Sequence, residues 1–169
     1  MDRMHLRYWY RLNGVDRYAP WFDGGETDGF LTDQEGRIPT FSTKNRLDEW
    51  SHAIGVNYAE SIVIGNTTTL TDLDRSQAWA AESNRIGLNA SNLLSTWNMF
   101  TDVAATVSDS GEFEVASKAA TGYDALFFAC DADRSGSTVP KWSDFQIREV
   151  KDVLMLGQAL FKRNSCEVS

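Results

Sequence analysis

The sequence contains little cysteine, histidine or proline, with two Cys, two His and three Pro in 169 residues. Two cysteines allow at most one disulfide, so we expect the chain to depend on a hydrophobic core and not on a disulfide framework. His5 and His52 lie far apart in sequence, and neither has a cysteine at ligand spacing. A disulfide-rich scaffold and a structural zinc site are therefore not predicted, and we expect no metal or other cofactor.

Long apolar runs are also absent from the sequence. No window approaches the roughly 18 consecutive apolar residues of a membrane-spanning helix. The first seven residues form neither an apolar core nor a small-residue cleavage site. We therefore expect no membrane segment, no signal peptide and a cytoplasmic location, in which Cys130 and Cys166 remain reduced.

Positive charge is scarce, because 16 Lys and Arg face 24 Asp and Glu and give a net charge of -8. Binding to nucleic-acid phosphates requires a basic surface, so this balance argues against DNA or RNA as the main partner. An acidic surface instead accelerates the encounter with a basic protein. The content of 42% hydrophobic residues is typical of a globular protein, and the length fits a single domain spanning residues 1–169.

Residues 1–65 are rich in predicted strands. His5–Leu12 and Val15–Phe22 flank Asn13-Gly14, which is a strong β-hairpin signal. Pro20 lacks a backbone donor and predicts that the second strand lies at a sheet edge or ends there. Phe30–Thr32 and Arg37–Phe41, which contains Pro39, predict a second hairpin with an edge strand.

A helix and one further strand complete this part of the chain. We predict a helix over Thr43–Ile54, with Ser42 as its N-cap and Gly55 at its end. Ser61–Ile64 is short, β-branched and followed by Gly-Asn, which predicts a strand.

Residues 70–163 are rich in predicted helices. The best pattern is an apolar stripe over Ala90–Val107, which predicts the central core helix. Ser143 and Gln146 form a capping box for a final helix over roughly Asp144–Lys162. A helix from Thr71 or Asp72 to about Asn84 and a short helical turn at Ala116–Ala120 are also predicted, whereas Tyr123–Cys130 is too short to assign. Strands followed by helices predict an α+β fold with an antiparallel N-terminal sheet packed against C-terminal helices.

The most unusual local feature is an acidic segment over residues 23–35, which contains no basic residue before Arg37. It is either a solvated loop or a surface for a basic partner, which could occupy a nucleic-acid-binding cleft by imitating phosphate charge. Trp21 lies beside the segment, and it either covers the core or acts as an exposed interface anchor. The candidate partner-binding residues are Trp21, Asp23, Glu26, Asp28, Asp33 and Glu35.

Calcium binding is an alternative, because two segments partly match the EF-hand loop. Residues 131–142 have suitable side chains at positions 1, 3, 5 and 6, but Trp142 stands where the bidentate acid is required. Residues 24–35 carry Glu35 at position 12, but Gly24 stands at position 1. Each loop therefore lacks a different ligand.

Catalytic motifs are not recognisable in the sequence. It contains no Gly-x-Ser-x-Gly elbow and no cysteine with a histidine in a familiar local pattern. No pair of carboxylates stands out as an acid and a base. We therefore do not expect an enzyme, although an active site dispersed along the chain remains an alternative.

Three stretches resemble small bacterial immunity proteins, including the partners of contact-dependent growth-inhibition toxins. They are residues 28–36 with Phe41 and the following helix, Leu93-Leu94 with residues 97–104, and residues 123–127 with 139–143 and the final helix. The resemblance covers about half of the chain and consists of core and cap positions. It implies a cytoplasmic inhibitor that binds one secreted toxin domain, often a nuclease, and blocks its active site or its substrate path. It identifies no functional residue.

Overall fold

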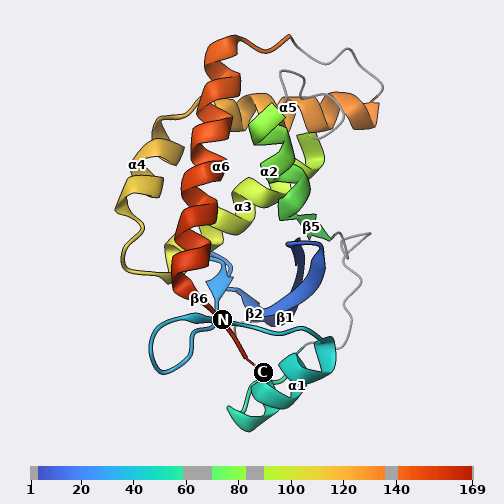
Figure 1. Cartoon of the computed structure of the whole chain (residues 1–169), viewed down its shortest axis with the longest axis vertical. Helices are drawn as coiled ribbons and strands as arrows, with labels where there is room; N and C mark the ends of the chain where they lie inside the picture. The colour runs from blue at the N-terminus through green and yellow to red at the C-terminus, as the bar shows by residue number, and fades with distance from the viewer. Residues whose placement is uncertain (1–3, 59–69, 83–89, 136–140, 169) are drawn as a thin grey trace.

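The computed structural model describes residues 4–58, 70–82, 90–135 and 141–168. A layer of strands carries the helices from the second part of the chain on one side and α1 on the other (Figure 1). This confirms the predicted α+β class. The strands are β1 (Met4–Leu12), β2 (Val15–Asp23), β3 (Gly29–Phe30), β4 (Ile38–Thr40), β5 (Thr71–Asp72) and β6 (Ser165–Glu167). The helices are α1 (Lys44–Ala53), α2 (Leu73–Glu82), α3 (Ala90–Thr106), α4 (Gly111–Ala119), α5 (Gly122–Ser135) and α6 (Asp144–Asn164).

The predicted first hairpin is confirmed. β1 and β2 pair antiparallel along their whole length, from Met4 with Asp23 to Leu12 with Val15. Asn13 and Gly14 have φ values of 55° and 72°, which is the geometry of a type I′ turn. Both carboxylate oxygens of Asp74 accept the amide hydrogens of this turn, at N···O distances of 2.7 Å. The start of α2 thus holds the hairpin tip.

The prediction that Pro20 marks an edge is wrong, because β2 lies inside the sheet order β3-β2-β1-β5. Pro20 is opposite Arg7, and its carbonyl accepts a hydrogen bond from the Leu31 amide at 2.9 Å, on the side away from β1. The missing N–H would therefore also point away from β1 and be no part of the hairpin ladder. Proline is tolerated in this interior strand because β3 is only two residues long.

The predicted second hairpin is also wrong. β3 pairs antiparallel with β2, whereas β4 pairs in parallel with β6 from the far end of the chain. The intervening turn does form, since Asp33 accepts hydrogen bonds from the amides of Glu35 and Arg37. The two strands separate because the Phe30 amide donates to the Thr106 hydroxyl of α3, at 2.9 Å. A helix side chain therefore takes the donor that a hairpin partner would have taken.

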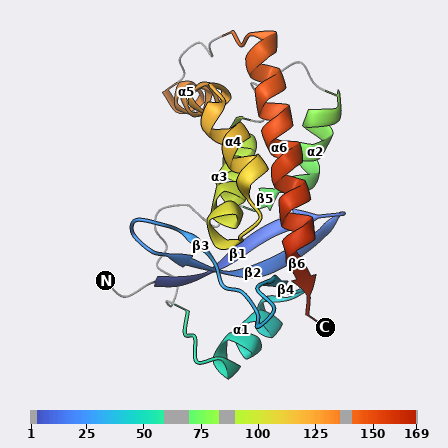
Figure 2. The ribbon, with the colours of Figure 1, turned by 90° about the vertical axis from the view of Figure 1, so that its left-hand side faces the viewer.

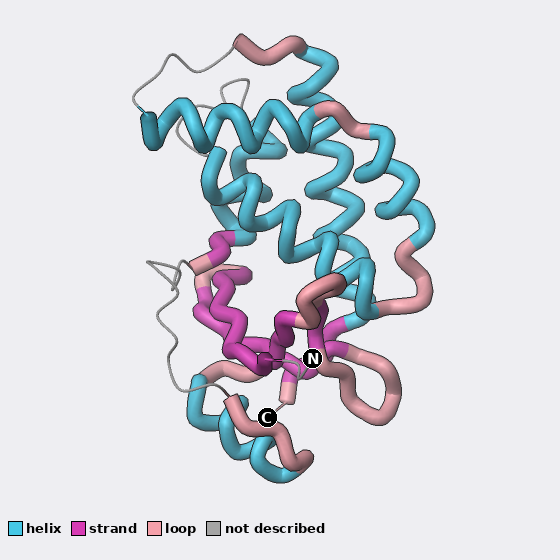
Figure 3. The backbone as a smooth tube through the Cα atoms, turned by 180° about the vertical axis from the view of Figure 1, so that it is seen from behind, coloured by secondary structure: helices cyan, strands magenta, loops and turns pink. Residues whose placement is uncertain are grey.

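Helix α1 lies under the sheet, on the face opposite the other helices (Figure 3). Its N-cap is Thr43 and not the predicted Ser42, because the Thr43 hydroxyl accepts the Arg46 amide. Arg7 of β1 and Asp48 of α1 form an ion pair at 2.6 Å. The predicted strand over residues 61–64 lies outside the described residues.

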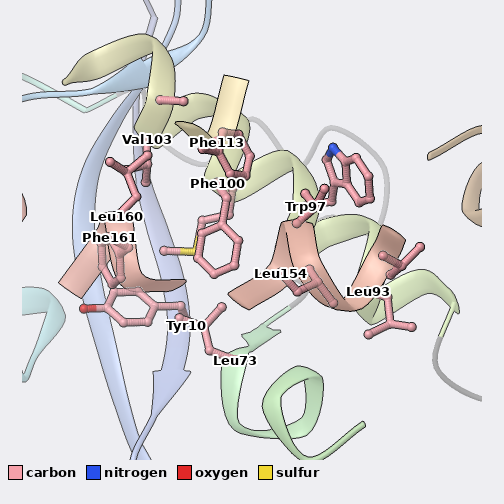
Figure 4. Packing of buried hydrophobic residues seen from close by; sticks show 14 of the residues in the cluster. Tyr10, Leu73, Leu93, Trp97, Phe100, Val103, Phe113, Leu154, Leu160 and Phe161 are labelled. Atoms are coloured by element: carbon pink, nitrogen blue, oxygen red, sulfur yellow. The ribbon is translucent and has the colours of Figure 1, made fainter. Parts of the chain in front are cut away.

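The core is formed where α3 crosses α6. Figure 4 shows Phe100 and Trp97 of α3 among leucine and aromatic side chains of α6 and the sheet. Gly157 permits this crossing, because a Cβ there would lie 2.2 Å from Cδ2 of Phe100. The α6 capping box at Ser143 and Gln146 is confirmed. No described helix, α6 included, is long and apolar enough to cross a membrane.

Two further helices are longer than the sequence predicted. The predicted turn at residues 116–120 belongs to α4, and the unassigned residues 123–130 belong to the longer α5. Phe127 and Phe128 of α5 are more than half exposed, so these two apolar residues do not mark the buried face of the helix. The first residue of α5, Gly122, packs closely against α6. A Cβ at Gly122 would lie 2.6 Å from a methyl carbon of Val150 on α6.

Gly157→Ala tests the crossing of α3 and α6. Alanine normally favours a helix interior, but here the added methyl group would collide with the buried Phe100 ring. We expect the free energy of unfolding to fall by about 1–3 kcal/mol, measured by urea unfolding. Gly111→Ala in α4 is the control, because a Cβ at that position would meet no other atom within 4 Å. Equal stability of the two variants would contradict the close approach.

Candidate functional site

A cleft of about 620 Å³ opens between the N-terminal half of β1 and one side of α3. Its lining combines aromatic rings, hydroxyl and amide groups, and three carboxylates, whose convergence is typical of a binding site. These carboxylates come from the end of β2, from the following loop and from α3. The residues that matter for its chemistry are Tyr8, Trp21, Asp23, Asp28, Asn98, Asp102 and Tyr123.

Helix α3 supplies a polar stripe to the cleft. Ser95, Asn98 and Asp102 follow one another at helical spacing and line the same wall. Asp102 is the only charged residue among the 17 residues of α3. Sequence reasoning missed it because the neighbouring apolar stripe dominated the pattern. A single carboxylate in an otherwise uncharged core helix was the signal that could have identified it.

Trp21, one of the residues that line the cleft, joins β2 to α3. Its indole Nε1–H donates to Oδ2 of Asp102 at 2.9 Å. The ring also lies near Tyr8, with 6.4 Å between the centroids, and packs against the core. Trp21 is therefore half-buried and not the freely exposed anchor that one of the two interpretations required. Its hydrogen bond orients the Asp102 carboxylate, and its ring gives the cleft an aromatic surface.

Asp102 is a half-buried carboxyl group without a cationic partner in the described part of the chain. Burial raises its pKa to about 6, the Trp21 hydrogen bond opposes this shift, and the nearby charge of Asp28 adds to it. Because the carboxyl group is half-buried and has no cation beside it among the described residues, its ionised form is poorly solvated and poorly compensated. A cation entering the cleft would stabilise that form.

Part of the acidic segment borders this cleft. Asp23 and Asp28 both line it, and each also stabilises the loop between β2 and β3. Oδ1 of Asp23 accepts the Gly25 amide at 2.9 Å, and Oδ1 of Asp28 accepts the Gly24 amide at 3.2 Å. Glu26, between them, is exposed and does not line the cleft.

The other part of the acidic segment lies elsewhere. Asp33 and Glu35 border a separate hollow beside α1 and both form ion pairs with Arg37. The backbone N–H of Arg37 is the main cause that lowers the pKa of Asp33. The structure thus brings together Trp21, Asp23 and Asp28 of the predicted set, and it separates them from Asp33 and Glu35.

The calcium loops do not have the backbone that an EF-hand requires. Residues 131–135 are helical, although they would be the first five positions of one loop. Residues 24–35 directly follow the strand β2, where an EF-hand has its entering helix. Within the described residues, no group of three or more His, Cys, Asp or Glu side chains is arranged to hold a metal ion.

A second hollow of about 360 Å³ lies between α2 and α6. It is lined mainly by leucine, alanine and the Phe100 ring, and a hydrogen bond between Gln77 and Gln158 spans it. It contains no carboxylate, so it offers less specific chemistry than the cleft beside α3.

Comparisons of the chain with protein-family models, with curated proteins and with solved structures find no match. The chemistry of the cleft is therefore the basis for the function proposed below.

Asp102→Asn should change how stability depends on pH. Between about pH 4 and 6, folded Asp102 retains a proton that the unfolded chain has lost, so its ionisation lowers the free energy of unfolding as pH rises. Asparagine keeps an acceptor for Trp21 and removes the charge. We expect the variant to match the natural protein near pH 4 and to exceed its unfolding free energy by roughly 1–3 kcal/mol above pH 6.

Urea unfolding at several pH values measures this difference. Asp152→Asn, at an exposed position of α6, is the control for losing one negative charge. A difference between the Asp102 variant and the natural protein that stays constant from pH 4 to 7 would contradict the inferred burial of the Asp102 charge.

Proposed function

We propose that this protein is a cytoplasmic immunity protein that binds a basic surface of a toxin domain and neutralises the toxin by occlusion. The observation that carries the proposal is the uncompensated carboxylate of Asp102 in the cleft beside α3, with Asp28 close enough to raise its pKa. The resemblance of the sequence to immunity proteins and the net charge of -8 also favour it. Protein binding, and not chemistry of its own, would then be the function.

A cationic side chain from the toxin would bind in the cleft between Asp28, Asp102 and Trp21. An ion pair at contact distance in a partly desolvated site is worth on the order of a few kcal/mol. The face of the Trp21 indole adds a cation–π contact. Because both carboxylates are already oriented by hydrogen bonds, little conformational freedom is lost on binding.

Binding such a cation would also block the toxin, if the cation lies in the toxin's substrate-binding surface. Lysine and arginine side chains that contact nucleic-acid phosphates lie in the active-site cleft of a nuclease. An acidic protein that engages them covers the path of the substrate. The net negative charge would also accelerate the encounter, with a rate that falls as salt is added.

One observation favours a second function, catalysis. A carboxyl group with a pKa of about 6 in an open cleft has the property of a general acid or base near neutral pH. The two functions respond differently to a bound cation. A cationic partner lowers the pKa of Asp102, whereas a catalytic carboxyl must keep a raised pKa when its substrate is bound.

Neutralising Asp102 should weaken the complex with the toxin. The measurement is isothermal titration calorimetry with the C-terminal domain of the toxin encoded by the neighbouring gene. We expect one-to-one binding, with an affinity that falls about 10- to 100-fold for Asp102→Asn, roughly 1.4–2.8 kcal/mol. Asp28→Asn should act in the same direction, because asparagine keeps the hydrogen bond to Gly24 and loses only the charge.

Asp152→Asn is the matched control and should change the affinity less than twofold. The salt dependence should also be smaller for Asp102→Asn than for the natural protein, since one charge contact is lost. No complex with the toxin domain would refute the immunity function. Equal weakening by the variants of Asp102 and Asp152 would show that net charge acts without the cleft.

A further inference from the structure

Among the described residues, the N-terminal half of β1 has an open edge. β5 pairs with β1 only at Tyr10 and Arg11, near the hairpin turn. From Met4 to Trp9, β1 pairs with β2 alone among the described residues. Figure 2 shows the hairpin extending past β5 toward the start of the chain. Such an edge presents backbone donors and acceptors that another strand can pair with.

The register identifies the backbone groups that face outward. Tyr18 exchanges two backbone hydrogen bonds with Phe41, so its polar groups point away from β1. The Pro20 carbonyl points away in the same manner, toward Leu31. In an antiparallel pair, opposite residues of this kind both point outward. The register partners of Tyr18 and Pro20 are Trp9 and Arg7, whose N–H and C=O groups therefore face away from β2. The parallel register of Tyr10 with Thr71 directs the Thr71 N–H to the Trp9 carbonyl, so the open edge offers both backbone groups of Arg7 and the N–H of Trp9.

This edge forms one wall of the candidate site. Leu6, Arg7, Tyr8 and Trp9 are consecutive, and all line the cleft. Successive side chains of a strand point to opposite faces, so a cavity that contacts all of them runs along the strand edge. The polar stripe of α3, with Asp102, forms part of the opposite wall. Backbone groups and carboxylates therefore border the same space.

We propose that the partner adds an extended segment to the open edge of β1, with a lysine or arginine on that segment reaching Asp102 and Asp28. The inference rests on the proposed binding function and defines its mode. Backbone hydrogen bonds to Arg7 and Trp9 would supply affinity, and the carboxylates would select a basic residue. The Arg7 side chain does not repel this residue, because it pairs with Asp48 on the opposite face.

The segment has a defined size and pattern. Within the described part of the chain, β1 has no second strand partner from Met4 to the N–H of Trp9, so an added strand of about five residues would match the edge. Side chains of an added strand alternate between the two faces of the sheet. Only every second one points toward α3, and the basic residue must occupy such a position.

Three synthetic six-residue peptides test the mode. The first alternates threonine and valine around one arginine, the second replaces arginine with glutamine, and the third keeps arginine but carries backbone N-methyl groups along one edge. We expect the arginine peptide at saturating concentration to slow amide hydrogen exchange at Arg7 and Trp9 at least 10-fold. The glutamine peptide should bind at least 10-fold more weakly, and the N-methylated peptide should give no protection.

Variants of the full chain complete the experiment. Asp102→Asn should reduce affinity for the arginine peptide to that for the glutamine peptide, whereas Asp152→Asn should leave it unchanged. Slow exchange of Arg7 and Trp9 amides in the free protein would overturn the proposal, because the edge would already be occupied. Equal binding of the N-methylated peptide would also overturn it.

The toxin complex separates this inference from the proposed function. Binding of the toxin domain without protection of the Arg7 and Trp9 amides would refute strand addition and leave the immunity function standing. Absence of toxin binding, with the peptide results as expected, would refute the immunity function and leave an edge that binds basic peptides.

Discussion

The contact of Phe100 with Gly157 fixes the position of α3, and most of the structure depends on that helix. α3 contacts α2, α4, α5 and α6 as well as two strands of the sheet. Phe100 is buried, and the absence of a side chain at Gly157 lets its ring lie directly against α6. Asp102 lies two residues further along the same helix. The packing that builds the core therefore also sets a carboxylate above the edge of the sheet.

Local signals predicted the elements whose structure is decided locally. The Asn13-Gly14 turn, the apolar stripe of α3 and the capping box at Ser143 each depend on residues close in sequence, and each is present. The prediction of the second hairpin was wrong because the pairing of these strands depends on residues far away in the sequence. Thr106 takes the Phe30 amide and β6 takes the edge of β4, and neither partner is visible from residues 30–41.

The candidate site was partly predictable for the same reason. Its acidic loop is a local feature, and Asp23 and Asp28 were identified from charge alone. Asp102 was not, because its role depends on Trp21, which is 81 residues away in sequence. The separation of Asp33 from the cleft was equally hidden, since it depends on where the chain turns toward β4. Charge density in a sequence identifies a surface, but the fold decides which charges share a cavity.

The parallel pairing of β4 with β6 has a consequence for the order of folding. The Thr40 hydroxyl donates to the Cys166 carbonyl, a contact between residues 126 positions apart. Contacts at such separation form late, since loop-closure entropy must be overcome first. During synthesis, β4 leaves the ribosome long before its strand partner exists. The β1–β2 hairpin can form while the chain is still growing, but the small second sheet must wait until residues 165–167 have been made.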